Sequence, residues 1–469
     1  MSDRLSPLDV SFLYMETPTT PFHVGGVATF EPPAEGFDYE RLVDLITERI
    51  ALVPRYRQKV RFIPGRLANP VWVDDEDFDV TYHVRRSALP KPGTDAQLRE
   101  LVGRLMGRRL DRSRPLWETY LVEGLEGGRV GIITKTHHAM VDGVSAVDIG
   151  TVILDVTPEP REVPADDWRP HRAPGAASLV VGALTDYVKR PTQALDTARS
   201  AVFDARATAG KVSGVASGVL ASAVSIARPA PDSPLNVRIG EQRRFGMAAT
   251  DLDDYKLVRK AHGGTINDVV LATVAGALRA WLLTRGEAVT PSSVVRAMVP
   301  VSVRSEAPGG ATGNRISSLF VDLPVGEGNP VVRLQRVSYA MRGHKESGES
   351  VGAQALVQMS GFAPPTIHSL GARAASSMTR RLFNLVVTNV PGPQFPLYAA
   401  GARMLSMHPV VPLAKGQALA VGLTSYDGGV FYGLNADRDG MADVDVVASL
   451  LEESLAELVG TVPGMDAHR

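Results

Sequence analysis

Hydrophobic residues along 1–165 follow two different spacings, which predict an alternation of strands and helices. Some segments place apolar residues every three to four positions, the spacing that forms one buried face of a helix. Others are short runs rich in β-branched and aromatic residues, which are typical of strands. These patterns predict helices at 38–53, 96–110 and 145–156, and strands at 22–30, 117–123 and 129–136.

The same alternation returns in 235–469, after a segment of different character. Prolines cluster at both ends of that segment, and Ala, Gly, Ser and Val predominate between them. We therefore expect an α/β protein with one half at 1–165 and the other at 235–469, joined by a partly helical linker at 166–234. In the second half the patterns predict helices at 267–283 and 444–459, and strands at 294–303, 317–323, 385–389 and 430–435.

The composition excludes several classes of function. The chain has 469 residues, of which 44% are hydrophobic and 22% charged, the balance of an ordinary globular protein. Lys plus Arg number 50 and Asp plus Glu 51, so the net charge of -1 gives no general attraction for nucleic acid. The chain has no Cys, which excludes disulfides, thiolate metal sites, iron–sulfur clusters and a Cys nucleophile.

The sequence predicts at most a peripheral relation to membranes. Residues 1–9 lack the basic and apolar regions of a signal peptide. No run approaches the roughly 20 apolar residues that cross a bilayer, and 212–227 is too short and too weakly apolar. We expect a cytoplasmic protein that touches the inner face of a membrane or the surface of lipid droplets.

The strongest chemical signal is a histidine pair that follows a predicted strand. His137 and His138 are followed by Asp142 and Gly143, ahead of a predicted helix. Because strand side chains alternate between faces, the two rings should point in opposite directions, which argues against one zinc site built from both. A neutral imidazole at a strand end is a natural general base, because its pKa lies near neutral pH. The alternative is that both rings are ordinary satisfied polar groups near a turn.

The HHxxxDG pattern at 137–143 resembles the signature of the CoA-dependent acyltransferase superfamily, which includes chloramphenicol acetyltransferase and the condensation domains of peptide synthetases. Other segments resemble, in order, the blocks of the bacterial wax ester synthase/diacylglycerol acyltransferase family. These segments are 5–9 with Phe12, Leu13 and Glu16, then 21–26, 114–118, 267–268, 299–304 with Gly313-Asn314, and 388–393.

The resemblance implies two chloramphenicol-acetyltransferase-like halves, with the active site in a channel between them. It also implies acyl transfer from acyl-CoA to diacylglycerol or a long-chain alcohol. On this sequence His138 is then the general base and His137 a supporting residue. Asp142 is a structural residue that holds the turn, and Gly143 belongs to the same turn. The other blocks supply candidate substrate-binding residues: Pro115, Leu116, Trp117, Asn267 and Asp268.

The expected chemistry is a direct transfer. His138 would take the hydroxyl proton as the oxygen attacks the thioester carbonyl, and the imidazolium would then protonate the departing sulfur. No Gly-x-Ser-x-Gly elbow lies near the histidines, which argues against an acyl-enzyme. No phosphate-binding loop, dinucleotide fingerprint or calcium loop is present, so we expect no tightly bound cofactor and no metal, with acyl-CoA as co-substrate. Asn267 is a candidate oxyanion donor, with a helix N-cap as its alternative role.

Several alternatives stay open at this point. The protein could make mainly wax esters, could acylate a polyketide or glycolipid hydroxyl, or could be a silent lipid-binding protein on the same scaffold. The intact histidine motif argues against the silent protein. Basic residues crowd 55–61 and 104–114, where they could bind CoA phosphates or lipid headgroups or form a solvated charged face. Phe12, Trp117 and Met140 could line an acyl channel or pack in the core.

Overall fold

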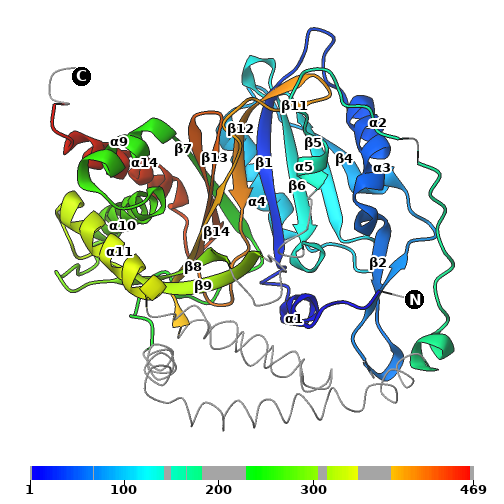
Figure 1. Cartoon of the computed structure of the whole chain (residues 1–469), viewed down its shortest axis with the longest axis horizontal. Helices are drawn as coiled ribbons and strands as arrows, with labels where there is room; N and C mark the ends of the chain where they lie inside the picture. Colours follow the sequence, from blue (N-terminus) through cyan, green and yellow to red (C-terminus); the bar gives the residue numbers. More distant parts are fainter. Residues whose placement is uncertain are drawn as a thin grey trace.

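Two six-stranded sheets stand side by side, and helices pack against each of them (Figure 1). This arrangement confirms the predicted α/β class. The structure is a computed structural model, and it describes residues 3–66, 68–141, 149–164, 166–181, 229–304, 314–346 and 382–464. Residues 182–228 of the predicted linker lie outside these residues.

The first sheet contains strands from both ends of the chain. Its order is β11-β12-β1-β6-β5-β4, and β1 pairs antiparallel with both β6 and β12. Residues 398–410 therefore complete a sheet that otherwise belongs to 1–165, so the two halves are not separate along the sequence. The bounds are β1 (His23–Glu31), β4 (Val84–Ala88), β5 (Trp117–Glu123), β6 (Val130–His137), β11 (Tyr398–Ala399) and β12 (Ala402–Val410).

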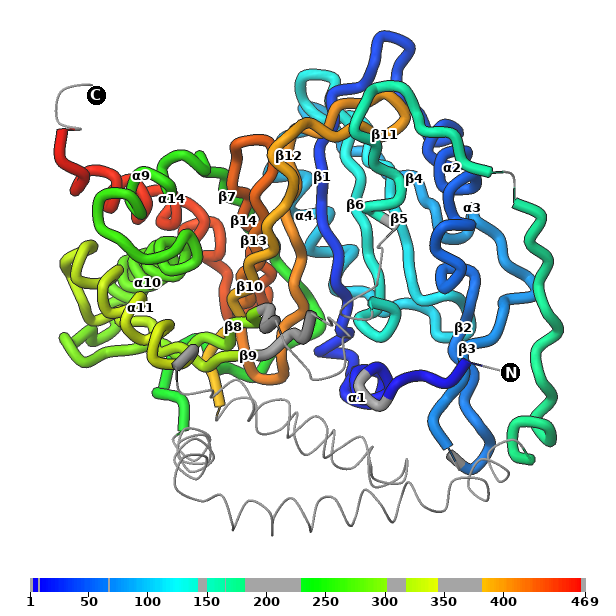
Figure 2. Tube along the Cα trace, viewed as in Figure 1, coloured from blue at the N-terminus to red at the C-terminus, as the bar shows by residue number. Residues whose placement is uncertain are grey.

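The second sheet is built wholly from residues after 235. Its order is β7-β14-β13-β10-β8-β9, in which β10 lies parallel to both β13 and β8. The bounds are β7 (Arg243–Asp251), β8 (Val295–Arg304), β9 (Asn314–Leu323), β10 (Leu385–Pro391), β13 (Leu419–Tyr426) and β14 (Gly429–Asp437). Figure 2 shows the helices of this half gathered on the side away from the first sheet: α9 (Leu252–His262), α10 (Ile266–Thr284), α11 (Pro330–Glu346) and α14 (Val444–Gly460).

The helices of the first half begin at clear local signals. Thr94 and Gln97 form a reciprocal cap at the start of α4, and Ser6 caps α1. Strands β2 and β3 pair antiparallel with each other and form a separate two-stranded sheet. The bounds are α1 (Pro7–Met15), α2 (Tyr39–Arg49), α3 (Val80–His83), α4 (Asp95–Gly107), α5 (Ile149–Val152), β2 (Gln58–Arg61) and β3 (Val71–Asp74).

The two halves meet through closely packed backbone. A Cβ placed on Gly433 of β14 would lie 1.9 Å from the carbonyl oxygen of Pro409 in β12. Arg243 of β7 reaches across the same junction and donates to the carbonyl of Thr19. Bare glycine backbone therefore allows the second sheet to lie against the strand that completes the first.

Gly433→Ala should destabilise the protein by roughly 1–3 kcal/mol or more, because the added methyl meets a carbonyl that its strand holds in place. Urea denaturation measures the change. Gly175→Ala is the matched control, since no atom lies within 4 Å of the added methyl there. Equal free energies of unfolding for the two variants would contradict the close packing of the halves.

The described part of the linker runs along the outer edge of the first half. Asp166 pairs with Arg57, and the ring of Trp168 lies 4.7 Å below the same guanidinium. Leu179 packs with Val71 and Val73 of β3. This stretch of the linker is therefore anchored on its own half.

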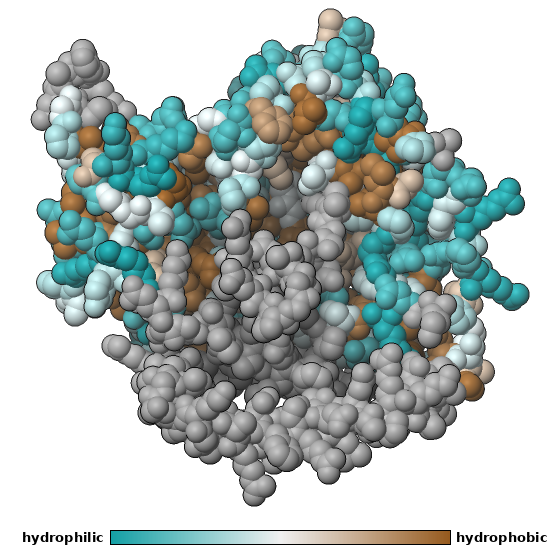
Figure 3. Space-filling view, viewed as in Figure 1, coloured by the Kyte–Doolittle hydropathy of each residue, from teal (hydrophilic) through white to brown (hydrophobic). Residues whose placement is uncertain are grey.

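The long apolar helix α10 belongs to the core of the second half. By length and composition it could cross a bilayer, but 72% of its most apolar window is buried among the described residues. Where the surface in Figure 3 is coloured, hydrophobic residues form separate patches among hydrophilic ones.

Candidate active site

The histidine pair sits at a sharp corner where β6 ends. His137 is the last residue of the strand, and His138 begins a single turn of 3-10 helix, η5 (His138–Met140). The ring Nδ1 of His137 accepts a hydrogen bond of 3.0 Å from the amide of Ala139, which fixes the turn. The amide of His138 donates to the carbonyl of Phe22, 2.9 Å away. Phe22 adopts a positive φ of 52°, an uncommon conformation for a residue of this size.

His137 lies inside a buried charge cluster. Its Nε2 is 3.5 Å from the carboxylate of Glu16, a residue that directly follows α1 and whose side chain is only 2% exposed. Arg112 donates to the same carboxylate, and Arg109 lies 3.3 Å from it. Because Nδ1 of His137 accepts the Ala139 amide, the neutral ring carries its proton on Nε2, facing Glu16. The Ala139 amide therefore sets the tautomer of this ring, and Glu16 is the charged group that its Nε2 faces.

The electrostatics of this cluster keep Glu16 ionised and His137 neutral. Burial opposes ionisation of Glu16, but the imidazole of His137, 3.5 Å away, and the charge and hydrogen bonds of Arg112 outweigh it, and the pKa of Glu16 lies below the usual value. Burial lowers the pKa of His137, although Glu16 opposes that shift. The corner is thus held by a carboxylate facing a neutral imidazole.

His138 has surroundings of a different kind. Its ring stacks on Phe12 of α1, with centroids 4.0 Å apart, and Phe12 in turn lies 6.0 Å from Phe22. The side chain is half-buried, whereas His137 is almost completely enclosed. Burial lowers the pKa of His138 to about 4, although its own backbone carbonyl favours the protonated ring. This imidazole is therefore neutral at pH 7 and free to accept a proton. The two rings have different neighbours, as predicted, but strand alternation is not the reason, because His138 lies beyond β6 in the 3-10 turn.

A second polar group on β6 was missed by the sequence reasoning. Lys135 is 1% exposed and lies 3.4 Å from Glu118 of β5, which also accepts a 2.6 Å hydrogen bond from Tyr120. Burial lowers the pKa of Lys135, while Glu118 opposes the shift. Lys135 also depresses the pKa of His23, which is already well below normal because the ring is buried. The signal in the sequence was a single lysine among the uncharged residues of this strand.

Lowering the pH from 7 to 5 should reduce the free energy of unfolding. Several buried histidines have lowered pKa values in the fold, whereas in the unfolded chain their pKa lies near 6.5. The unfolded state therefore binds more protons below pH 6.5, and each group costs up to about 1.4 kcal/mol per pH unit until its folded pKa is reached. Urea titrations at pH 7, 6 and 5 measure this loss, and a constant free energy would contradict it. The histidines are His23, His83, His137, His138 and His408.

Pro115, Leu116 and Trp117, from the block at 114–118, are buried next to the histidine corner. Trp117 is fully buried, donates from its indole N–H to the carbonyl of Tyr56 at 2.8 Å, and stacks on His83. The carbonyl of Leu116 accepts the amide of His137, and Pro115 is also buried. These contacts explain the block as packing that supports the corner, and a role in substrate binding stays a prediction.

Asn267 and Asp268, which form the block at 267–268, lie at the start of α10. The alternative role given for Asn267, as the N-cap of this helix, is wrong. Thr265 caps this helix, and Asp268 completes a reciprocal cap through its carboxylate. Asp268 therefore has a structural explanation. Asn267 is not the cap, and its side chain lies 3.4 Å from that of Asn389 in β10, within the segment 388–393. Two blocks far apart in sequence thus meet, and an oxyanion role for Asn267 stays a prediction.

The remaining candidates have mixed outcomes. Asp142 and Gly143 lie outside the described residues. Among the described residues, no group of His, Asp and Glu side chains has a metal-binding arrangement. Met140 packs in the core of the first half. Many cations of the two basic segments form ion pairs with other residues of this chain: Arg55 with Asp3, Arg57 with Asp166, Lys59 with Asp75, and Arg109 and Arg112 with Glu16.

Comparisons with known proteins identify the family. The model of the wax ester synthase/diacylglycerol acyltransferase catalytic domain matches residues 5–270, and that of the WS/DGAT C-terminal domain matches 312–459. A probable diacylglycerol O-acyltransferase of Mycobacterium tuberculosis, tgs2, is 36% identical over 97% of this chain and 98% of its own length. A second from the same species, tgs3, is 47% identical over 55% of this chain and 96% of its own.

Solved structures agree on the fold. The wax ester synthase/diacylglycerol acyltransferase of Marinobacter aquaeolei VT8 matches with a TM-score of 0.67 and 28% identity, covering 97% of this chain and 100% of that one. A condensation domain of the calcium-dependent antibiotic synthetase matches with a TM-score of 0.59 at 17% identity, over 98% and 97% of the two chains, which shows the fold alone. The chain therefore belongs to the wax ester synthase/diacylglycerol acyltransferase family and is an acyltransferase.

Proposed function

We propose that the protein transfers a long-chain acyl group from acyl-CoA to the free hydroxyl of diacylglycerol, with His138 as general base. The single observation that carries the proposal is the state of His138: a neutral, half-buried imidazole at a corner that hydrogen bonds hold in place. Full-length relatives named as diacylglycerol O-acyltransferases favour diacylglycerol as the acceptor.

The proposed reaction is a single displacement at the thioester. His138 accepts the proton of the acceptor hydroxyl while that oxygen forms a bond to the acyl carbonyl carbon. The carbon–sulfur bond then breaks, and the imidazolium returns the proton to the CoA thiolate, so that the ring is neutral again. The neutral ring is the form that can accept the hydroxyl proton, and the resulting imidazolium is acidic enough to return that proton to the thiolate.

The rest of the corner supports the base without touching the reacting atoms. Glu16 orients His137, His137 fixes the turn through the Ala139 amide, and the turn presents His138. The ring of Phe12 limits the orientations open to His138 and excludes water from one face. We also propose Asp142 and Gly143 as residues that shape this turn, as the family motif implies.

The acceptor is water-insoluble, so the protein should act at a lipid surface. Diacylglycerol resides in membranes and lipid droplets, and long-chain alcohols partition there as well. We propose a peripheral contact on the cytoplasmic side, with no nucleic acid partner and no tightly bound cofactor.

Release of CoA thiol from palmitoyl-CoA, measured with diolein or hexadecanol as acceptor, tests the proposed function. We expect release with diolein and a higher rate with diolein than with hexadecanol. A preference for hexadecanol would make the protein mainly a wax ester synthase. No release with either acceptor would refute the proposed donor and acceptor together.

A further inference from the structure

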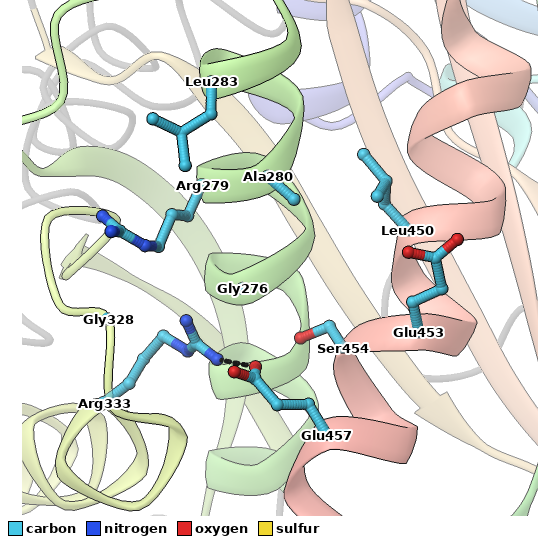
Figure 4. Close-up of a pocket in the computed structure, with 10 residues that line it drawn as sticks. All are labelled: Gly276, Arg279, Ala280, Leu283, Gly328, Arg333, Leu450, Glu453, Ser454 and Glu457. Atoms are coloured by element: carbon cyan, nitrogen blue, oxygen red, sulfur yellow. Dashed lines mark hydrogen bonds and ion pairs between the residues drawn. The ribbon is translucent and has the colours of Figure 1, made fainter.

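A cavity of about 280 Å³ lies in the second half, among residues of α10, α11 and α14 (Figure 4). None of its lining residues belongs to the histidine corner. Its floor is Gly276 of α10, which offers bare backbone. Leu283 of α10 and Leu450 of α14 line it as apolar residues, and Leu283 is 50% exposed.

Two buried polar groups converge on the floor of the cavity. The position of a Cβ on Gly276 would lie 2.1 Å from Oγ of Ser454 and 3.0 Å from the guanidinium carbon of Arg333. Ser454 is 6% exposed and Arg333 only 1%. Within the part of the chain that the structure describes, Oγ of Ser454 and Nε of Arg333 have no hydrogen-bond partner. Buried polar groups in this state are costly, so a bound oxygen that accepts from them would be stabilising.

The charges around the cavity favour an uncharged ligand. The positive charge of Arg333 is met by Glu457, whose carboxylate lies 2.5 Å from Nη2. Arg279 donates to the carbonyls of Val325 and Gly326 at 3.0 and 3.2 Å. The carboxylates of Glu453 and Glu457 line the same cavity and would repel an anion, while the two guanidinium groups would repel a cation.

A hydroxyl group fits these requirements, since its oxygen accepts from Ser454 or Arg333 and its hydrogen donates to Glu457. An attached apolar chain would lie against Leu283 and Leu450. We propose that this cavity is a second, non-catalytic binding site for a small uncharged amphipath that carries a hydroxyl group. The site is independent of the proposed reaction, because no residue of the histidine corner takes part in it.

Binding of 1-hexanol, followed by the midpoint of thermal unfolding, tests the site. We expect 1-hexanol to raise the midpoint of the wild type, and Ser454→Ala to weaken the apparent affinity about fivefold, the effect of one lost hydrogen bond. Ser449→Ala, on the exposed side of the same helix, should behave as wild type. Equal affinity in the wild type and Ser454→Ala would overturn the proposal, as would tighter binding of hexanoate than of 1-hexanol.

A second measurement separates a ligand site from a structural hydroxyl. Without ligand, Ser454→Ala should keep or raise the unfolding midpoint, because it removes a buried hydroxyl that lacks a partner. A lower midpoint would show that Ser454 stabilises the helix contact itself and would overturn the proposal. Crystals soaked in 6-bromo-1-hexanol should show the anomalous bromine signal in this cavity, and a signal only elsewhere would also overturn it.

Discussion

His138→Ala should lower the turnover of palmitoyl-CoA with diolein by about 10²–10⁴-fold, the usual contribution of a positioned general base. The alcohol is too weak an acid to attack the thioester at neutral pH without proton removal. In the described structure His138 is the half-buried imidazole of the corner, and it is neutral at pH 7. Release of CoA thiol measures the loss, and circular dichroism checks that the fold is retained.

Substitutions of two other histidines serve as comparisons for this result. His171→Ala is the control for a surface ring, since its side chain is 90% exposed, and it should leave turnover unchanged. His137→Ala should lose less activity than His138→Ala, because His137 acts only through the turn. Near-wild-type turnover of His138→Ala, or equal losses in both corner variants, would contradict the assignment of the base.

Glu16→Gln should reduce both stability and turnover. The substitution removes the negative charge that Arg109, Arg112 and His137 share inside the protein. Breaking a buried ion pair costs about 3–5 kcal/mol, and we expect roughly 2–3 kcal/mol because both arginines are partly exposed. Turnover should fall about tenfold or more, because His137 loses the group that orients it. Urea denaturation and thiol release measure the two effects.

Glu35→Gln is the matched control, because Glu35 is exposed, and it should leave both quantities unchanged. A Glu16→Gln protein with wild-type turnover but lower stability would show that Glu16 stabilises the fold without orienting the histidine corner.

The sequence predicted helices and strands well where a single segment carries its own hydrophobic pattern. The run at 117–123 is a strand with the predicted bounds, and the closing helix at 444–459 ends one residue later in the structure. The start of α10 was harder to predict. This helix begins at Ile266 because the side chain of Thr265, not that of Asn267, accepts the hydrogen bond from the helix backbone that caps it. Both residues are suitable caps, and only the backbone geometry decides between them.

The long-range features could not be read from a single sequence. Strand β12 lies in the first sheet although it follows β10 of the second, and its alternation of buried and exposed residues is irregular. Glu16 and His137 are far apart along the chain, so their contact leaves no local pattern. The pKa of about 4 for His138 arises from burial, which depends on the packing of α1 over the corner.

The central claim is that a half-buried, neutral His138 removes the proton of the acceptor hydroxyl. The pH dependence of kcat/KM for palmitoyl-CoA with diolein tests it most directly, because this quantity reports the base of the free enzyme. We expect activity to stay level from pH 7 to pH 5 in protein that remains folded, with an acid limb near pH 4 that is absent from the residual activity of His138→Ala. An acid limb at pH 6.5 or above, or one that persists in His138→Ala, would contradict the account.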